Sequence, residues 1–391
     1  RRQRQMCIRD SHYIMAPMFM PKGYLVEDAA AIKSAVRIPI IAVGRLHDVE
    51  VAERVLQEGK ADLIAIGRGL IADPEWAKKV IEHRVEDIRP CISCNYCVDF
   101  VSRALEARCT VNAELGEEFI FQIRPARQRK RILIIGGGPA GLEAARVAAE
   151  RGHEVWLFEK EGRLGGKLHV SAAAPSKKEI HRFTAYLIRQ IEKHRVRVEL
   201  GVTLGREELL GLHPDVVVLA TGSVPTIPPL PGADLPMVAI AEDVLLDRAS
   251  IGRRVVVVGG GGTGCDVAEY LLHRGHEITI LELLSHIGQG IEAITRRWLY
   301  YEFKKAGVRL LTRHRIARIE KGHAVALDER DQAVILPCDS VVLAMGYRPS
   351  DEMAFCLEEG FPVPVYRIGD CVRPGTILDA VTQGAHLAAK L

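Results

Sequence analysis

The chain has 391 residues, of which 48% are hydrophobic and 26% are charged, and its formal net charge is +3. This length suggests two to four domains, and the apolar content is sufficient for substantial cores. The basic residues form no long run, and no apolar stretch approaches the roughly 18 residues of a membrane span. We therefore expect a globular, cytoplasmic protein that binds neither nucleic acid nor a membrane.

Residues 38–45 and 62–68 read as two strands, each followed by a helix. The first helix is expected to reach about residue 58, and Asp73 and Pro74 are expected to open the second as N-cap and first residue. Both strands end in Gly-Arg, which suits a phosphate at the C-terminal face of a (β/α)8 barrel, because glycine admits the phosphate and arginine binds it. Ordinary surface arginines at strand ends are the alternative. The residues concerned are Gly44, Arg45, Gly67 and Arg68.

Four cysteines follow in one short stretch, three of them within seven residues. Three thiolates at this spacing can converge on a compact 4Fe-4S cluster if the chain curls around it, and a more distant fourth closes the site. The alternatives are a structural zinc, which usually takes two separated pairs of cysteines, and ordinary buried cysteines. We interpret the stretch as an iron-sulfur site with the ligands Cys91, Cys94, Cys97 and Cys109.

The sequence next predicts a strand over residues 131–135 that runs into a glycine turn and an alanine-rich helix. Gly136 permits the tight turn, Gly138 lets the backbone approach a pyrophosphate, and Gly141 allows the helix to pack closely on the strand. The following strand ends in Glu159, a carboxylate placed for ribose hydroxyls. The predicted contacts of this unit are Gly136, Gly138, Pro139, Ala140, Gly141 and Glu159.

The same unit recurs 123 residues later and again ends in an acidic residue, Glu282. Two copies with identical spacing favour two dinucleotide sites over ordinary strand-to-helix turns. A carboxylate at this strand end binds the free 2′-hydroxyl of NADH and repels the additional phosphate of NADPH, so we expect NADH. Arg274 and His286 leave NADPH as the minority alternative. The turn of this unit comprises Gly259, Gly261, Thr263 and Gly264.

Three further phrases resemble flavoproteins with two dinucleotide-binding domains. Gly162-Arg-Leu-Gly-Gly-Lys-Leu and Val216-Val-Val-Leu-Ala-Thr-Gly resemble the FAD half, and Tyr366-Arg-Ile-Gly-Asp resembles its second FAD contact, where Asp370 meets the ribityl chain. Relatives often carry glutamine where this chain has Lys167. The phrase that ends in Met-Gly-Tyr-Arg-Pro resembles the return from an inserted NAD(P)H domain. The resemblance implies contacts at Gly166, Lys167, Thr221, Gly222, Gly346, Gly369 and Asp370.

Almost the whole chain resembles one family, the old-yellow-enzyme-related flavoproteins of the 2,4-dienoyl-CoA reductase and trimethylamine dehydrogenase type. The other matching phrases are Ile41-Ala-Val-Gly-Arg, Ala65-Ile-Gly-Arg-Gly-Leu-Ile-Ala-Asp-Pro-Glu-Trp and Arg89-Pro-Cys-Ile-Ser-Cys-Asn-Tyr-Cys. The resemblance implies an α/β fold with two Rossmann-like domains, the second inserted in the first. The expected parts are the C-terminal end of an FMN barrel (1–88), a 4Fe-4S loop and linker (89–130), an FAD domain (131–227 and 346–391) and an NAD(P)H domain (228–345).

A complete barrel needs about 250 residues, so only its last strands and helices are expected here and the FMN site is incomplete. The resemblance implies that Arg45 and Arg68 hold the FMN phosphate and that electrons pass from NADH through FAD and the cluster to FMN. FMN then reduces an activated carbon–carbon double bond in a small-molecule substrate, and a homo-oligomer is possible. No catalytic residue is assigned. The alternatives are an amine dehydrogenase, a reductase similar to the small subunit of glutamate synthase, and a structural zinc protein.

Overall fold

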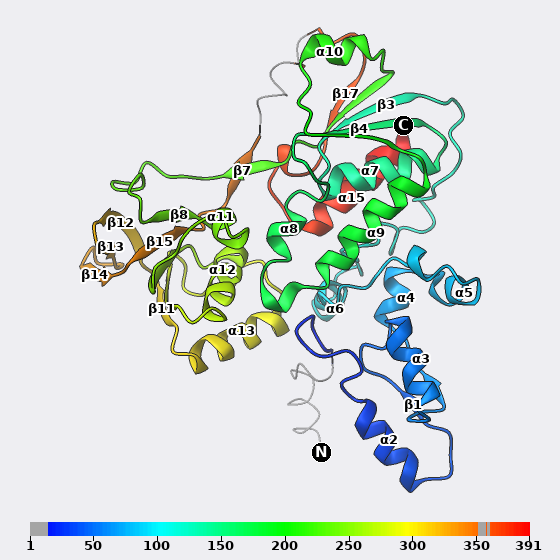
Figure 1. The fold of residues 1–391 in the computed structure, drawn as a ribbon, viewed down its shortest axis with the longest axis horizontal. Helices are drawn as coiled ribbons and strands as arrows, with labels where there is room; N and C mark the ends of the chain where they lie inside the picture. The colour runs from blue at the N-terminus through cyan, green and yellow to red at the C-terminus, as the bar shows by residue number, and fades with distance from the viewer. Residues whose placement is uncertain (1–14, 351–356, 358–359) are drawn as a thin grey trace.

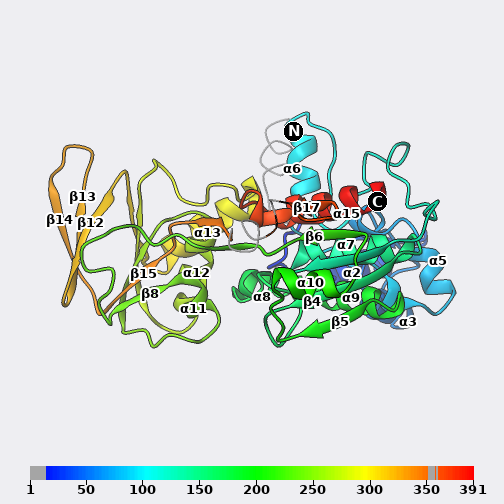
Figure 2. The ribbon, with the colours of Figure 1, turned by 90° about the horizontal axis from the view of Figure 1, so that it is seen from above.

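The computed structural model describes residues 15–350, 357 and 360–391, and the remaining residues of the expected domains lie outside this description. The described chain is α/β with two five-stranded parallel sheets. Figures 1 and 2 show an N-terminal segment (15–88), a cysteine segment (89–130), a first unit (131–219 with 365–391) and a second unit (238–343). The α/β class expected from the sequence is confirmed.

A pair of short parallel strands organises the N-terminal segment, with Ile41 opposite Leu63. These two side chains are 59% and 54% exposed, so little covers the pair on one face. Asp48 caps the helix after the first strand by accepting from the Val51 amide. The elements are α2 (Val26–Ala35), β1 (Ile41–Ala42), α3 (Val49–Gln57), β2 (Leu63–Ile64), α4 (Arg68–Ala72), α5 (Trp76–Ile81) and η1 (Val85–Asp87).

The structure corrects two local expectations in this segment. Arg68 is the first residue of helix α4 and not the end of strand β2. Asp73 and Pro74 do not open α5, which begins two residues after the proline. One oxygen of the Asp73 carboxylate accepts from Lys79 at 2.7 Å and from the Arg89 amide at 2.8 Å. The other accepts from the Glu75 amide at 3.1 Å, so Asp73 closes a turn ahead of α5.

The cysteine segment shares the hydrophobic core of the first unit. Ile92 and Val111, each 2% exposed, belong to that core, and three of the four cysteines pack against it. The chain turns tightly before α6 (Tyr96–Ser102), because Ser93 and Asn95 have φ values of +51° and +61°. This curl is the local feature that the cysteine spacing requires.

The first unit is built on a parallel sheet with the strand order β17-β6-β3-β4-β5. Helix α15 packs so closely on α7 that a Cβ at Gly384 would lie 2.4 Å from the Ala140 carbonyl oxygen. The strands are β3 (Arg131–Ile135), β4 (Glu154–Glu159), β5 (Arg197–Leu200), β6 (Val216–Leu219) and β17 (Val365–Arg367). The helices are α7 (Pro139–Glu150), α8 (Leu168–Ser171), η2 (Pro175–Lys177), α9 (Ile180–Lys193), α10 (Arg206–Gly211), η3 (Gly369–Cys371) and α15 (Ile377–Lys390).

The second unit repeats this plan with the strand order β11-β10-β9-β15-β8 and adds a three-stranded antiparallel sheet, β12-β13-β14. Its parallel sheet comprises β8 (Val238–Ile240), β9 (Arg254–Val258), β10 (Glu277–Glu282), β11 (Arg309–Thr312) and β15 (Ser340–Leu343). The added strands are β12 (Arg315–Glu320), β13 (His323–Leu327) and β14 (Ala333–Pro337). The helices are α11 (Ala241–Leu245), α12 (Gly262–Leu272) and α13 (Ala293–Lys305).

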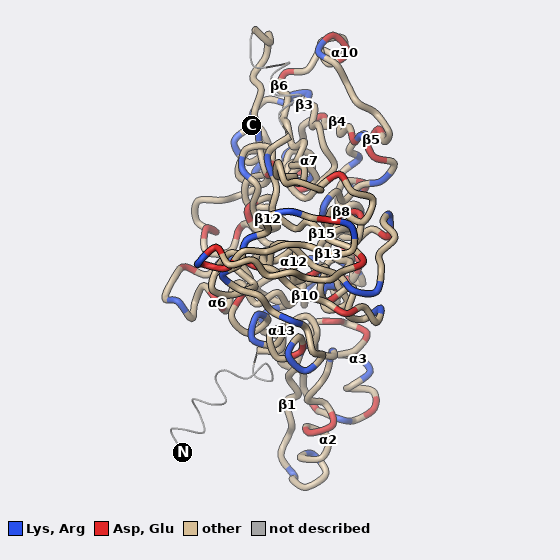
Figure 3. The backbone as a smooth tube through the Cα atoms, turned by 90° about the vertical axis from the view of Figure 1, so that its left-hand side faces the viewer, with Lys and Arg blue, Asp and Glu red and all other residues tan. Residues whose placement is uncertain are grey.

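Two chain crossings join the units, and they pair as antiparallel strands β7 (Ser223–Pro225) and β16 (Tyr347–Pro349). Figure 1 shows this pair between the two sheets. Acidic and basic positions alternate over the backbone in Figure 3. Among the described residues, no helix combines the length and apolar character that crossing a membrane requires.

Candidate functional site

The glycine turn of the first unit contains three positions that differ in the space around them. Gly136 has a φ of +113°, and a Cβ there would lie 2.2 Å from the Ala220 carbonyl oxygen. At Gly141 a Cβ would lie 1.9 Å from the Gly136 carbonyl oxygen, so only glycine lets α7 approach β3. Gly138 has nothing within 4 Å of a Cβ, which leaves open space at the N-terminus of α7. An anion fits such a position.

The second unit has the same construction. Gly259 has a φ of +101° and would place a Cβ 2.3 Å from the Ala344 carbonyl oxygen, and Gly264 would place one 1.8 Å from the Gly259 carbonyl oxygen. Gly261 again has nothing within 4 Å of a Cβ. Two separate turns therefore each combine two closed glycine positions with one open position, which is the arrangement that a pyrophosphate needs.

The acidic strand ends are fixed to these turns by backbone amides. The Glu159 carboxylate accepts from the amides of Gly137 at 2.6 Å and Glu161 at 2.8 Å. Glu282 is held in the same way by two amides at 2.6 and 2.7 Å. Both carboxylates are buried, and each oxygen retains a lone pair for a further donor. A ribose contact at each residue stays a prediction.

The C-terminal phrase of the first unit lies beside its glycine turn. Gly369, with a φ of +70°, would place a Cβ 2.9 Å from that of Ala140, the second residue of α7. The next residue, Asp370, accepts from the Ser223 hydroxyl at 2.7 Å and from the Gly375 amide at 3.0 Å. Pro139 opens α7, where the missing N–H of proline costs no helical hydrogen bond.

Lys167 extends from the same region to the junction of the two units. Its ammonium donates to the Ser223 hydroxyl at 2.7 Å and lies 3.4 Å from a Glu242 carboxylate oxygen. It also lies 3.3 Å from the centroid of the Tyr347 ring, a cation–π contact. Burial lowers the pKa of Lys167, and the nearby carboxylates of Glu242 and Asp370 oppose that shift.

A small cavity opens at this junction. It encloses about 190 Å³ of empty space, part of it open to solvent. Burial raises the pKa of the Tyr347 phenol, and the neighbouring Glu242 carboxylate raises it further. The sequence predicted Thr263 and Gly346 at this site but did not indicate Glu242 or Tyr347. The lining includes Pro225, Glu242, Thr263, Gly346 and Tyr347.

Thr221 and Gly222 lie where the chain leaves the first sheet. The Thr221 hydroxyl donates to the Ser350 carbonyl at 3.3 Å, and Gly222 has a φ of +75°. Gly166 has a φ of +49° and would place a Cβ 3.0 Å from the Cα of Gly138. The predicted positions of the flavin half therefore gather at one end of the first sheet, around the N-terminus of α7.

The four cysteines line one pocket of about 290 Å³ of empty space, part of it open to solvent. Burial raises the pKa of Cys94 and Cys109 to about 12, and backbone amides such as that of Tyr96 at Cys94 oppose the shift. Such thiols give up their protons readily only to a metal. No set of three or more His, Cys, Asp or Glu side chains in the described residues is placed to hold a single metal ion.

The two arginines expected to bind a phosphate face the cysteine segment. Arg45 donates to the Ser93 hydroxyl at 3.2 Å and pairs with Glu179 of the first unit at 3.0 Å. Arg68 donates to the Asn95 side chain and lines the cysteine pocket. Phosphate binding by either arginine stays a prediction. Each follows the glycine expected beside it, Gly44 or Gly67.

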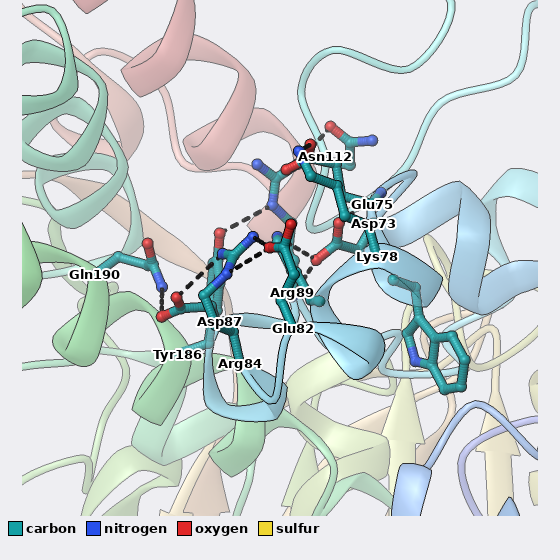
Figure 4. A network of polar contacts seen from close by, with 12 residues as sticks. Asp73, Glu75, Lys78, Glu82, Arg84, Asp87, Arg89, Asn112, Tyr186 and Gln190 are labelled. Atoms are coloured by element: carbon teal, nitrogen blue, oxygen red, sulfur yellow. Dashed lines mark hydrogen bonds and ion pairs between the residues drawn. The ribbon is translucent and has the colours of Figure 1, made fainter.

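A buried arginine next to the cysteines connects three parts of the chain (Figure 4). Arg89 donates to the Asn112 side chain at 2.5 Å and to the Tyr186 hydroxyl of α9 at 3.3 Å, while its amide donates to Asp73. Asp87 on η1 adds a bond to Lys193 of α9 at 2.6 Å. The sequence did not single out this network, because its partners come from segments up to about 100 residues apart.

Comparison with known proteins agrees with this geometry. Residues 130–384 match the pyridine nucleotide-disulphide oxidoreductases, and residues 17–87 match the NADH:flavin oxidoreductase / NADH oxidase family. The chain is 40% identical over 384 residues to NADH oxidase of Thermoanaerobacter brockii, covering 96% of this chain and 59% of that protein. It is 34% identical over 383 residues to cinnamate reductase of Clostridium sporogenes, covering 96% and 56%. The structure of 2-naphthoyl-CoA reductase has a TM-score of 0.92 at 30% identity, covering 96% of this chain and 57% of that chain.

The two glycine turns are built alike, and the matching families are flavin and pyridine nucleotide oxidoreductases. Together these findings define the chain as a nucleotide-dependent flavin oxidoreductase. It belongs to the pyridine nucleotide-disulphide oxidoreductase family and, with its N-terminal match, to the old-yellow-enzyme-related flavoproteins of the 2,4-dienoyl-CoA reductase type. The chain spans less than two thirds of the length of each of these relatives.

Proposed function

We propose that this protein is an iron-sulfur flavoprotein that passes electrons from NADH through FAD and a 4Fe-4S cluster to FMN, which reduces an activated carbon–carbon double bond. One observation carries the proposal: the cysteine pocket packs on the same core as the first dinucleotide turn, so the two sites lie on one rigid part of the molecule. Cofactors supply the redox chemistry, and the protein positions them and sets their potentials.

The spacing of the cysteines supports a cluster over a lone zinc ion. A structural zinc usually takes its four thiolates from two separated pairs of cysteines. Here three of the four cysteines fall within seven residues, and all four line one pocket. Backbone amides of Val111 and Asn112 point to the Cys109 sulfur, and hydrogen bonds of this kind tune the potentials of iron-sulfur sites.

The two turns support FAD in the first unit and NADH in the second. Asp370 and Ser223 lie beside the first turn, where an FAD ribityl chain has donors and acceptors to meet. Glu282 is held at the end of β10 by backbone amides, and a carboxylate at that point disfavours the 2′-phosphate of NADPH. The cavity beside Thr263 and Tyr347 opens at the junction where a nicotinamide would face the flavin half.

The acceptor side of the relay would lie in the N-terminal segment. The N-terminal segment offers Arg45 and Arg68 for an FMN phosphate, and both arginines are already engaged with the cysteine segment. The named substrates of two relatives, cinnamate and 2-naphthoyl-CoA, are conjugated carbonyl compounds. We therefore propose an unsaturated acid or acyl-CoA as the substrate class of the complete protein.

The test is anaerobic reconstitution followed by titration with NADH. We expect about four irons per chain, and rapid bleaching of the bound flavin by NADH. Cys94→Ser is expected to lose iron while NADH still bleaches FAD, because hydride transfer between the two units does not involve the pocket. Cys338→Ser, a buried cysteine in the second unit, is the matched control and should retain the iron.

Two outcomes would contradict the proposal. One tightly bound zinc and no iron would remove the relay. Flavin that NADH leaves oxidised but that a secondary or tertiary methylamine bleaches would favour the amine dehydrogenase alternative.

A further inference from the structure

Lys167 lies at the junction of the two dinucleotide units, where its ammonium contacts residues of both. It precedes α8 in the glycine loop that lies against the first turn, where the Gly165 amide donates to the Gly137 carbonyl at 2.8 Å. Its backbone therefore belongs to the flavin half. Its ammonium contacts residues of both halves: Ser223 on β7 at 2.7 Å, and Glu242 on α11 of the second unit at 3.4 Å.

The charges around this ammonium form a chain across the junction. Asp370, beside the first turn, accepts from Ser223, and Ser223 accepts from Lys167. On the other side Glu242 of the second unit and Tyr347 of the crossing strand β16 line the cavity at the junction. One cation thus lies between two carboxylates, one from each unit, and its side chain is 28% exposed. Such a cation is partly shielded from solvent, so its field acts more strongly than at the surface.

Hydride transfer moves a charge across this junction. The C–H bond of the nicotinamide breaks, NAD⁺ leaves, and one hydrogen nucleus with two electrons is added to the flavin half. The flavin half therefore gains one negative charge that a nearby fixed cation stabilises. Glutamine at this position would supply a hydrogen bond without the charge.

We propose, resting on the function above, that Lys167 is a positioning residue whose ammonium favours reduction of FAD by NADH and holds Glu242 of the second unit at the flavin half. Glu242 moderates that effect by neutralising part of the charge. The proposal predicts opposite consequences for removing the two partners. If the ion pair were purely structural, removing either partner would change the FAD potential and the reduction rate in the same direction.

The test uses the reconstituted protein and three substitutions at the pair. Lys167→Met is expected to shift the FAD midpoint potential to more negative values and to slow anaerobic reduction by NADH at least tenfold. Lys167→Arg keeps the charge and should remain within about threefold of the unmodified protein. Glu242→Gln should shift the potential in the positive direction. Lys321→Gln, at an exposed turn of the second unit, is the control for loss of one lysine.

All rates are measured per bound FAD, and thermal unfolding checks that each variant is folded. If Lys167→Met does not retain FAD, Lys167→Gln replaces it, because glutamine keeps a donor for Ser223. Equal potentials and rates in Lys167→Met and Lys321→Gln overturn the inference, and so do shifts of the same sign in the Lys167 and Glu242 variants. Failure of NADH to bleach the unmodified protein instead overturns the proposed function itself.

Discussion

His47, two residues after Arg45, is a buried histidine whose ring lacks a hydrogen-bond partner at one nitrogen. It is 8% exposed, and its Nε2 has no hydrogen-bond partner in the structure. Burial, with the positive charges of Arg45 and Arg68, lowers the pKa of His47 to about 4. The ring is therefore neutral in the folded protein at neutral pH and becomes protonated on unfolding in mild acid.

This difference predicts an acid-sensitive contribution to stability. Because the folded pKa lies below the unfolded value of about 6.5, the unfolded chain binds more protons between those values, and stability falls as the pH drops through that range. The loss between pH 7 and pH 5 should be about 2 kcal/mol. His47→Leu should remove that part of the pH dependence in urea unfolding measured at both pH values.

The matched control is His273→Leu, a substitution of an exposed histidine at the C-terminal end of α12. This variant shows how the same replacement acts where the side chain is exposed. Equal losses in the unmodified protein and in His47→Leu would contradict the assignment. The sequence gives no sign of this histidine, because its burial arises from helix α4: a Cβ at Gly69 would lie 2.6 Å from that of His47.

At the scale of elements, a buried polar contact joins η2 of the first unit to α12 of the second. The Lys177 ammonium lies 2.7 Å from the Asp266 carboxylate, which is 8% exposed in its side chain. Ser176 donates its amide and its hydroxyl to Glu269 one turn further along α12, at 2.8 and 2.7 Å. Because α12 begins at the second glycine turn, this contact also orients that turn relative to the first unit.

Removing the cation of this pair should destabilise the protein. Lys177→Met leaves the Asp266 carboxylate buried without its partner, which should lower the free energy of unfolding by about 2–3 kcal/mol. This cost is below the full value for a buried ion pair because the Lys177 side chain is 24% exposed. Lys178→Met, at the exposed neighbouring position, should change the free energy of unfolding by less than about 0.5 kcal/mol. Denaturant unfolding of both variants measures the difference, and equal values would show that the pair contributes nothing.

The sequence predicted an element well where residues close together in the chain determine its backbone conformation. The glycine turns at Gly136 and Gly259 could be predicted because a positive φ and a close carbonyl demand glycine whatever surrounds them. The late start of α5 could not, because one Asp73 oxygen binds the distant Arg89 amide and Lys79 while the other closes a turn on the Glu75 amide. Contacts across the junction depend on how two units pack, which no single stretch of sequence encodes.

At the scale of the molecule, the parts of the chain differ in how far they share a hydrophobic core. The cysteine segment and the first unit share one core, to which the N-terminal segment contributes Ala72, while the rest of that segment has a separate core around Leu46. The second unit has cores of its own. It meets the others through side chains such as Trp298, which stacks on Phe19 with centroids 3.8 Å apart. The glycine turn of the second unit and the cysteine pocket therefore rest on different cores.

The open glycine positions allow that separation to be tested without unfolding either unit. Gly138 and Gly261 have φ values of −77° and −67° and nothing within 4 Å of a Cβ, so alanine should fit both turns. A methyl group there would occupy the space expected for a pyrophosphate. Gly138→Ala should therefore lose FAD and keep NADH binding, and Gly261→Ala should keep FAD but lose its bleaching by NADH.

The control distinguishes blocked binding from damaged folding. Gly211→Ala, at the end of α10 and away from both turns, also has nothing within 4 Å of its Cβ and should behave as the unmodified protein. Flavin content, NADH titration and melting temperature are measured for all three variants. Loss of both nucleotides from either single variant would mean that the two turns do not act independently. In that case binding at one turn must depend on the other, through contacts such as that of Val170 on α8 with the core of the second unit.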